Sequence, residues 1–144
     1  MSLLDRSNVK IRLMTGSDVS AVLSFDWAEI VEKEKIASQR GGHNDASFIA
    51  EVDGHRVGFI LARILFVGRP MTSVCQLHLI AVRPDYQHHG IGSLLLNSLH
   101  SYCKTQNVHS IRVLVDHDDT ELLNYFQGLG FHHSSKINLD MLCE

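Results

Sequence analysis

The chain has 144 residues, which suits one domain with a substantial hydrophobic core and is short for two. Hydrophobic residues make up 44% of it and charged residues 20%, as in ordinary globular proteins, and the formal net charge is −3. A nucleic-acid-binding domain would carry a basic excess, and a membrane-spanning helix would need about 18 consecutive apolar residues. The sequence has neither feature. We therefore expect a single domain over residues 1–144, with neither nucleic acid nor membrane as a partner.

The cysteines and the N-terminus favour a cytoplasmic protein. The three cysteines are odd in number, widely spaced and without a C-x-x-C pair, as expected for thiols in a reducing compartment. The first ten residues lack the apolar core of a secretory signal. The sequence leaves open whether the chain forms a homodimer.

Ten histidines raise the question of a metal site. The pairs His88–His89 and His132–His133 are adjacent residues, and neighbours on a strand or helix point in different directions. Zinc-finger spacing and the H-E-x-x-H motif are both absent. We therefore expect no metal.

The first half of the chain predicts a strand, a helical segment and a hairpin. Alternating residues predict a strand over 9–14, and Asp18 can cap a helix over 19–37. The pair Asp53–Gly54 suits a type I′ turn between two apolar runs, so residues 47–67 predict a β-hairpin.

The second half predicts a strand–helix–strand crossover with a further helix. The predicted elements are a strand over 74–82, a helix over 90–105, a strand over 110–115, a helix over 118–130 and last strand material over 131–142. Asp118 and Glu121 have capping-box spacing at the start of the second of these helices. Hairpins followed by a crossover predict an α/β (α+β) fold, with a single mixed, mostly antiparallel sheet of about six or seven strands flanked by helices.

The stretch RPDYQHHGIG (83–92) lies between a predicted strand and a predicted helix. The N–H groups that lead into a helix N-terminus form an anion site, and glycine lets the ligand approach the backbone. Rossmann and P-loop motifs are absent, since Leu95 occupies the third glycine position and no G-K-[ST] occurs. A tight loop that only starts a helix is the alternative.

The wider stretch resembles the acetyl-CoA motif of the GNAT N-acetyltransferases. Gln87, Gly90 and Gly92 meet the Q/R-x-x-G-x-G/A pattern of that motif, after a strand and before a leucine-rich helix. NYFQGLGF (124–131) resembles the second landmark of the family, an aromatic helix that ends in Gly-Phe. The resemblance implies an acyl-CoA N-acyltransferase-like fold, acetyl-CoA as cosubstrate, and an amine acceptor that is a small molecule or a protein.

The resemblance also implies how the cofactor is held. Loop amides would bind the CoA pyrophosphate, and the preceding strand would pair with the pantetheine through its backbone. The CoA-binding residues that it implies are Ile80, Ala81, Val82, Gln87, His88, His89, Gly90, Ile91, Gly92, Ser93, Asp119 and Phe126. His88 and His89 stand where many relatives carry a basic residue, and Asp119 where the family often has an asparagine.

Strand 74–82 offers candidates for the catalytic machinery. Strict alternation would place Gln76 and His78 on one side of it, against an apolar odd-numbered side. An imidazole titrates near neutrality and can accept an ammonium proton, although a half-exposed structural histidine is the alternative. The run QLHLIAV (76–82) resembles the HLHALAV run of the serotonin N-acetyltransferases, which implies that His78 is the base and that Gln76 replaces a first imidazole.

Two further sites follow from the resemblance. Asp26 and Glu29 lie where the family borders its acceptor, and carboxylates there would attract a cationic amine; a solvated helix face is the alternative. The tyrosine that protonates the departing thiolate in many relatives corresponds to Phe126, and Tyr125 is rotated from that position by about 100° on a helix.

The sequence therefore predicts an N-acetyltransferase that moves acetyl from acetyl-CoA to a primary amine by direct attack in a ternary complex. We expect no covalent intermediate, because no cysteine or serine stands in an activating arrangement. The alternative is a non-catalytic acyl-CoA-binding regulatory domain of the same fold.

Overall fold

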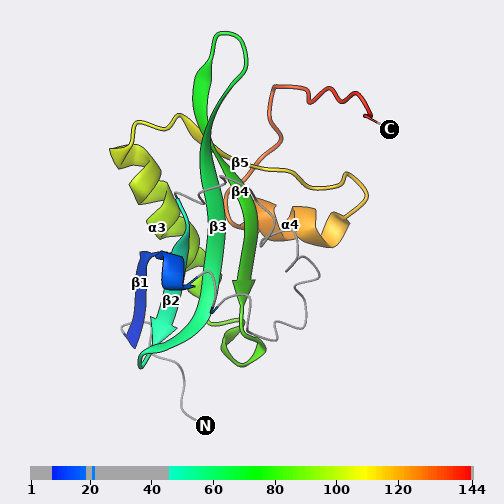
Figure 1. The fold of residues 1–144 in the computed structure, drawn as a ribbon. Helices are drawn as coiled ribbons and strands as arrows, with labels where there is room; N and C mark the ends of the chain where they lie inside the picture. The colour runs from blue at the N-terminus through cyan, green and yellow to red at the C-terminus, as the bar shows by residue number, and fades with distance from the viewer. Residues whose placement is uncertain (1–7, 19–20, 22–45, 144) are drawn as a thin grey trace. The chain divides into compact units, whose positions relative to one another are not determined.

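The computed structural model describes residues 8–18, 21 and 46–143 (Figure 1). The predicted helix over 19–37, the loop over 39–45 and the residues Asp26 and Glu29 lie outside the described residues, apart from residue 21. The chain divides into two compact units, with the boundary after Leu114.

The first unit contains one five-stranded sheet (Figure 1). Its strands, in spatial order, are β1 (Val9–Leu13), β2 (Phe48–Val52), β3 (His55–Val67), β4 (Thr72–Val82) and β5 (Ser110–Val113). The first four pair antiparallel and β5 runs parallel to β4, so the predicted mixed, mostly antiparallel sheet is confirmed, with five strands rather than about six or seven. The 3-10 helix η2 (Pro84–Tyr86) and helix α3 (Ile91–Thr105) form the crossover.

The β2–β3 hairpin follows from its turn residues. Asp53 and Gly54 have φ angles of 51° and 79°, the two left-handed conformations that a type I′ turn needs. Beyond the turn, Ala50 faces Gly58 while Glu51 faces Arg56, so Val57 is an extra residue in a β-bulge.

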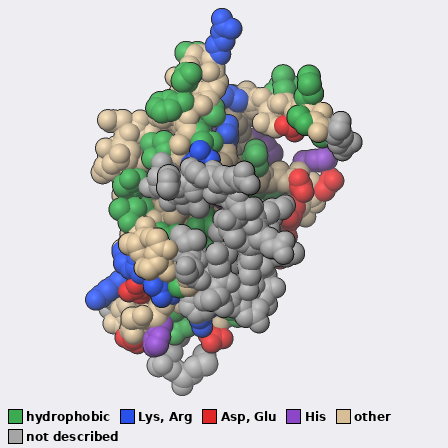
Figure 2. Space-filling view, viewed as in Figure 1, with side chains coloured by type: hydrophobic (Ala, Val, Ile, Leu, Met, Phe, Trp, Pro, Cys, Tyr) green, Lys and Arg blue, Asp and Glu red, His purple; other side chains and the backbone are tan. Residues whose placement is uncertain are grey.

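The β3–β4 hairpin is the longest part of the sheet. Its strands have 13 and 11 residues, against 5 in β1 and β2. Figure 2 shows hydrophobic and basic side chains at the tip, where Phe66 and Met71 are largely exposed.

Helix α3 covers one face of the sheet, which we call the helix face (Figure 1). The Tyr102 ring of α3 meets the Phe48 ring edge-on at a centroid distance of 5.8 Å, and Phe48 pairs with Ile60 on β3. The residues that α3 buries are Ile91, Leu95, Leu96, Leu99 and Cys103. Their spacing of three and four residues gives one apolar stripe, which explains why this segment forms a sheet-packed helix.

The opposite face has its own apolar cluster. Ile49, Phe59 and Leu61 are its buried residues, and Met14, Leu79 and Ala81 pack against them. Because register partners share a face, the pairing assigns each β4 residue to one of the two faces.

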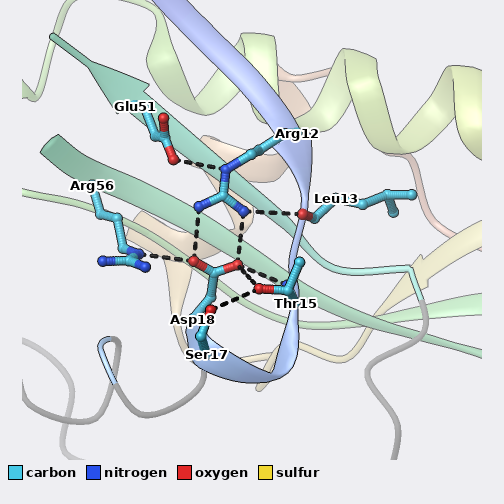
Figure 3. A network of polar contacts seen from close by, with 7 residues as sticks. All are labelled: Arg12, Leu13, Thr15, Ser17, Asp18, Glu51 and Arg56. Atoms are coloured by element: carbon cyan, nitrogen blue, oxygen red, sulfur yellow. Dashed lines mark hydrogen bonds and ion pairs between the residues drawn. The ribbon is translucent and has the colours of Figure 1, made fainter. Parts of the chain in front are cut away.

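Asp18 is fully buried at the edge of the sheet and joins three segments (Figure 3). Its carboxylate accepts hydrogen bonds from Arg12 at 2.7 and 2.8 Å, from Arg56 Nε at 2.8 Å and from the N–H of Thr15 at 2.7 Å. Arg12 also bonds Glu51 at 2.7 Å. Asp18 therefore caps from inside the first helical turn, three residues after Thr15, instead of preceding the helix as expected.

We expect Asp18→Asn to lower the free energy of unfolding by about 3 kcal/mol at pH 7, because two guanidinium groups lose their buried partner. The arginines, chiefly Arg12, hold the pKa of Asp18 well below its ordinary value. The carboxylate therefore stabilises the fold above the ordinary pKa of about 3.9, and this contribution is lost as the pH falls below it.

Urea titrations at pH 7 and near pH 2.5 would test this expectation. The difference in free energy of unfolding between wild type and Asp18→Asn should be smaller near pH 2.5 than at pH 7. Equal free energies of unfolding at pH 7 would contradict it.

The second unit holds helix α4 (Thr120–Gly128). Asp119 is its N-cap and accepts from the N–H of Leu122 at 3.1 Å, so the predicted capping box at Asp118 and Glu121 is wrong by one residue. Gly130, at φ 105°, ends the helix in a Schellman motif, in which the N–H of Phe131 donates to the carbonyl of Phe126 at 3.0 Å. The rings of these two phenylalanines pack edge to face at 5.4 Å.

The strand expected over 131–142 does not form among residues 131–143. Ile137, Leu139 and Met141 alternate with polar residues, which is the pattern of a strand, yet their side chains are 84–90% exposed. A strand needs a neighbouring strand as a hydrogen-bonding partner, and residues 115–143 taken by themselves contain none.

Candidate active site

A tightly bonded loop connects β4 to α3. The N–H of Arg83 donates to the carbonyl of Val57 at 2.7 Å, and the N–H of Tyr86 donates to the carbonyl of Arg83 at 2.8 Å. Gln87 donates through Nε2 to the carbonyl of Val82 at 3.0 Å. The first residue of the Q-x-x-G-x-G pattern therefore fastens the loop to the end of β4.

The backbone before α3 has a shape suited to anions. His88 and Gly90 have φ angles of 65° and 83°, both in the left-handed region. Gly90 is the N-cap, no side chain caps the helix, and the N–H of Leu94 donates to the Gly90 carbonyl at 3.1 Å as the helix begins. The amides of Ile91, Gly92 and Ser93 precede it and have no partner within the helix. Such a turn at a helix N-terminus concentrates N–H groups and positive potential.

The end of β4 has one edge without a described partner. On one side Ile80, Ala81 and Val82 pair with β3. On the other side β5 pairs only with the stretch from Val74 to Leu77, and no strand in the described part of the chain continues this pairing. The backbone from residue 78 to 82 can therefore receive an extended ligand in the manner of an added strand.

His78 is the extra residue of a second β-bulge. Leu61 faces Leu79 while Ala62 faces Leu77, so the strict alternation expected for β4 is wrong at this point. Before the bulge the even-numbered residues share the face opposite α3, and after it the odd-numbered residues do. Leu77 and Leu79 consequently lie on different faces.

The two proposed catalytic residues differ in burial. His78 is exposed, and its pKa is lowered by partial burial and by the charge of Arg63, so the imidazole is neutral at pH 7. Gln76 is buried, and its Oε1 accepts a hydrogen bond from Arg112 Nε at 2.9 Å. Gln76 is therefore held by β5, whereas His78 is accessible and can accept a proton.

Sequence reasoning missed Arg63 and Arg112. These residues are the register partners of Gln76 on β3 and β5, so the three form a row across the sheet. Only the strand register reveals this row, and no motif in the sequence marks it.

Asp119, Phe126 and Tyr125 belong to the second unit. Asp119 is exposed and its carboxylate is engaged as a helix cap. Phe126 is 5% exposed and Tyr125 43%, and their rings pack edge to face at a centroid distance of 5.3 Å. The assignment of Asp119 and Phe126 to CoA binding stays a prediction, as do the substrate-binding roles of Asp26 and Glu29.

Among the described residues, no group of three histidine, cysteine or acidic side chains could hold a metal ion. The same part of the chain has no helix long and apolar enough to cross a membrane. None of the three cysteines forms a disulfide.

Comparisons with known proteins find relatives in sequence and in structure. An uncharacterized N-acetyltransferase of Methanocaldococcus jannaschii is 27% identical over 94 residues, which are 65% of this chain and 42% of that protein, so the match spans less than half of the relative's length. A possible acetyltransferase from Clostridium difficile 630 has a similar structure, with a TM-score of 0.74 and 14% identity over 94% of this chain and 98% of that one.

AAC(6′)-Iy in complex with the bisubstrate analogue CoA-S-monomethyl-acetylneamine is similar with a TM-score of 0.65 and 20% identity, over 93% of this chain and 97% of that one. The family model described as the acetyltransferase (GNAT) family matches residues 17–131, which include the β4–α3 loop and the Gly-Phe end of α4. The chain thus belongs to the acetyltransferase (GNAT) family.

Proposed function

We propose that the protein transfers an acetyl group from acetyl-CoA to a primary amine, with both substrates bound at once. The observation that carries the proposal is the uncapped start of α3, which follows directly on a β4 edge without a described partner strand. Membership of the family makes CoA the ligand that this arrangement suits. A CoA-containing analogue bound to a protein of similar structure supports the same choice.

The proposed cofactor position uses two parts of the loop region. The amides from His88 to Ser93 bind the pyrophosphate, and the backbone from Ile80 to Val82 pairs with the pantetheine. Gln87 acts by holding the loop closed, through its bond to the Val82 carbonyl. The acetyl thioester then lies beside β4 near the bulge at His78.

In the proposed reaction the neutral amine attacks the thioester carbonyl carbon. The new C–N bond forms, the tetrahedral intermediate collapses, and the C–S bond breaks to release the CoA thiolate. His78 takes the ammonium proton, directly or through one water, since its lowered pKa keeps it neutral at pH 7. The thiolate leaves with its electron pair, and a thiol pKa near 8.5 keeps the cost of releasing it unprotonated modest near neutral pH. His78 then returns its proton to solvent, and the thiolate takes up a proton from solvent.

A panel of amines offered with acetyl-CoA, with release of the CoA thiol as the signal, would test the proposal. We expect at least one class of amine to raise thiol release well above the rate of spontaneous hydrolysis. A protein that binds acetyl-CoA tightly yet turns over no amine would instead be the non-catalytic acyl-CoA-binding regulator.

Tyr125→Phe should retain most of the wild-type turnover. Tyr125 precedes the position of the family's thiolate-protonating tyrosine by one residue, and its exposure differs from that of Phe126. The substitution removes only the hydroxyl, so steady-state kinetics with the best amine measures its contribution alone. A hundredfold fall in kcat with unchanged acetyl-CoA binding would show that Tyr125 does reach the sulfur.

A further inference from the structure

Two arginines flank the proposed catalytic strand. Arg63 on β3 and Arg112 on β5 are both register partners of Gln76, and register partners on neighbouring strands share a face. Adjacent strands lie about 4.8 Å apart, so the two arginine backbones are about 10 Å apart with Gln76 between them. Two guanidinium groups that start from this spacing can converge on one small anion.

The described residues leave these charges uncompensated. No carboxylate in the described part of the chain forms an ion pair with Arg63 or Arg112, in contrast to Arg12 and Arg56, which both bind Asp18. Arg112 donates through its Nε to the Gln76 amide oxygen, and no described residue bonds its terminal amino groups. Both arginine side chains are partly exposed.

The row lies close to the proposed reaction centre. Gln76 is two residues from His78 along β4, and the charge of Arg63 acts on the imidazole. Gln76 precedes the bulge at His78, whereas the proposed CoA position follows it, along β4 toward Val82 and the β4–α3 loop. An anion bound at Arg63 and Arg112 would therefore lie on the acceptor side of the thioester.

We propose that the acceptor carries a carboxylate near its amine, and that Arg63 and Arg112 bind this carboxylate on either side of Gln76. This inference rests on the proposed acetyltransferase function and names its substrate class. It differs from the prediction that Asp26 and Glu29 attract a cationic amine, which stays a prediction because these residues lie outside the described part of the chain. Guanidinium groups bind carboxylates through paired, charge-assisted hydrogen bonds, and they repel a second ammonium group.

The row also assists the chemistry of the amine. Two fixed positive charges near a bound ammonium favour its neutral form, which is the form that attacks the thioester. A carboxylate on the acceptor then offsets the repulsion that would otherwise keep the amine away.

Matched amines would test the proposal kinetically. Glutamate is compared with glutamine, β-alanine with β-alaninamide, and peptides with a glutamate at the second position with their glutamine counterparts. In the best pair we expect kcat/KM to favour the carboxylate by about tenfold or more. Arg63→Gln should remove most of this preference, because it should lower kcat/KM for the carboxylate far more than for the amide.

Lys104→Gln provides the matched control, since it removes one positive charge from an exposed position near the end of α3. It should leave the preference intact. Equal kcat/KM for carboxylate and amide in every pair would overturn the proposal. An equal fall in kcat/KM for both members of a pair in Arg63→Gln would overturn it as well.

A binding measurement separates this inference from the proposed function. Calorimetry with CoA present would compare N-acetylglutamate with N-acetylglutamine as product-like probes. We expect the carboxylate to bind more tightly, and Arg63→Gln and Arg112→Gln to abolish the difference. If no amine is acetylated, the proposed function fails, and this titration still decides whether the arginine row binds a carboxylate; equal affinities would overturn it.

Discussion

Acetyl-CoA should bind a Gly90→Val variant at least about a hundredfold more weakly than the wild type. Gly90 has a φ of 83°, and a β-branched residue in this region is strained, so the turn that aims the amides at the pyrophosphate would be lost. The valine side chain would also add bulk to the loop that is proposed to hold the phosphates. Losing about two charge-assisted hydrogen bonds accounts for the expected fall. Calorimetric titration with acetyl-CoA measures it.

A second variant separates backbone strain from blocked space. Gly92 lies in the first turn of α3 and is not among the residues with positive φ, so Gly92→Val adds bulk without that strain. Gly90→Asn adds a side chain at Gly90 itself with little backbone strain, because asparagine tolerates left-handed backbone. Wild-type acetyl-CoA affinity in folded Gly90→Val and Gly92→Val proteins, with unchanged melting temperatures, would remove the loop from the cofactor site.

His78→Ala should lower the acetylation rate at neutral pH by about two orders of magnitude, as expected for loss of a general base. Acetyl-CoA binding should stay nearly unchanged, because the proposed cofactor contacts near β4 are made by the backbone. His100, exposed on α3, provides the matched control, and His100→Ala should keep the wild-type rate.

The pH profile gives a second readout for His78. The neutral imidazole is the active form, so activity is lost as the pH falls through the pKa of His78. Burial and Arg63 lower that pKa, so this limb of kcat/KM should lie below the ordinary value of 6.5 and should vanish in His78→Ala. An unchanged rate and an unchanged limb in the variant would leave His78 as a structural residue.

The features that follow from local sequence were predictable. The Asp53–Gly54 turn depends on two residues that tolerate positive φ, and the structure places both there. The apolar stripe of α3 and the glycines before it are likewise local signals. The mixed sheet follows because hairpins and a crossover leave few other arrangements.

The features that depend on register were not predictable. A bulge shifts alternation by one residue, and nothing in the run around His78 marks where the extra residue falls. The bond between Arg112 and Gln76 joins residues 36 positions apart. The prediction of a strand over 131–142 was wrong for a related reason. Alternating apolar and polar residues are compatible with a strand, but they do not supply the neighbouring strand with which it must form hydrogen bonds.

The bulge at His78 changes which residues of β4 lie on each face: even-numbered residues lie opposite α3 before it, and odd-numbered residues do so after it. Gln76 before it and Leu79 and Ala81 after it all belong to the face opposite α3, an arrangement that no uninterrupted strand can produce. A polar row and a hydrophobic core can thus share one surface, in succession along a single backbone. If the same sequence paired without the bulge, the residues on one side of His78 would turn by half a turn, and either Gln76 or the pair Leu79 and Ala81 would leave this face. The extra residue therefore lets one strand supply a polar side chain to the proposed site and apolar side chains to the core on the same face.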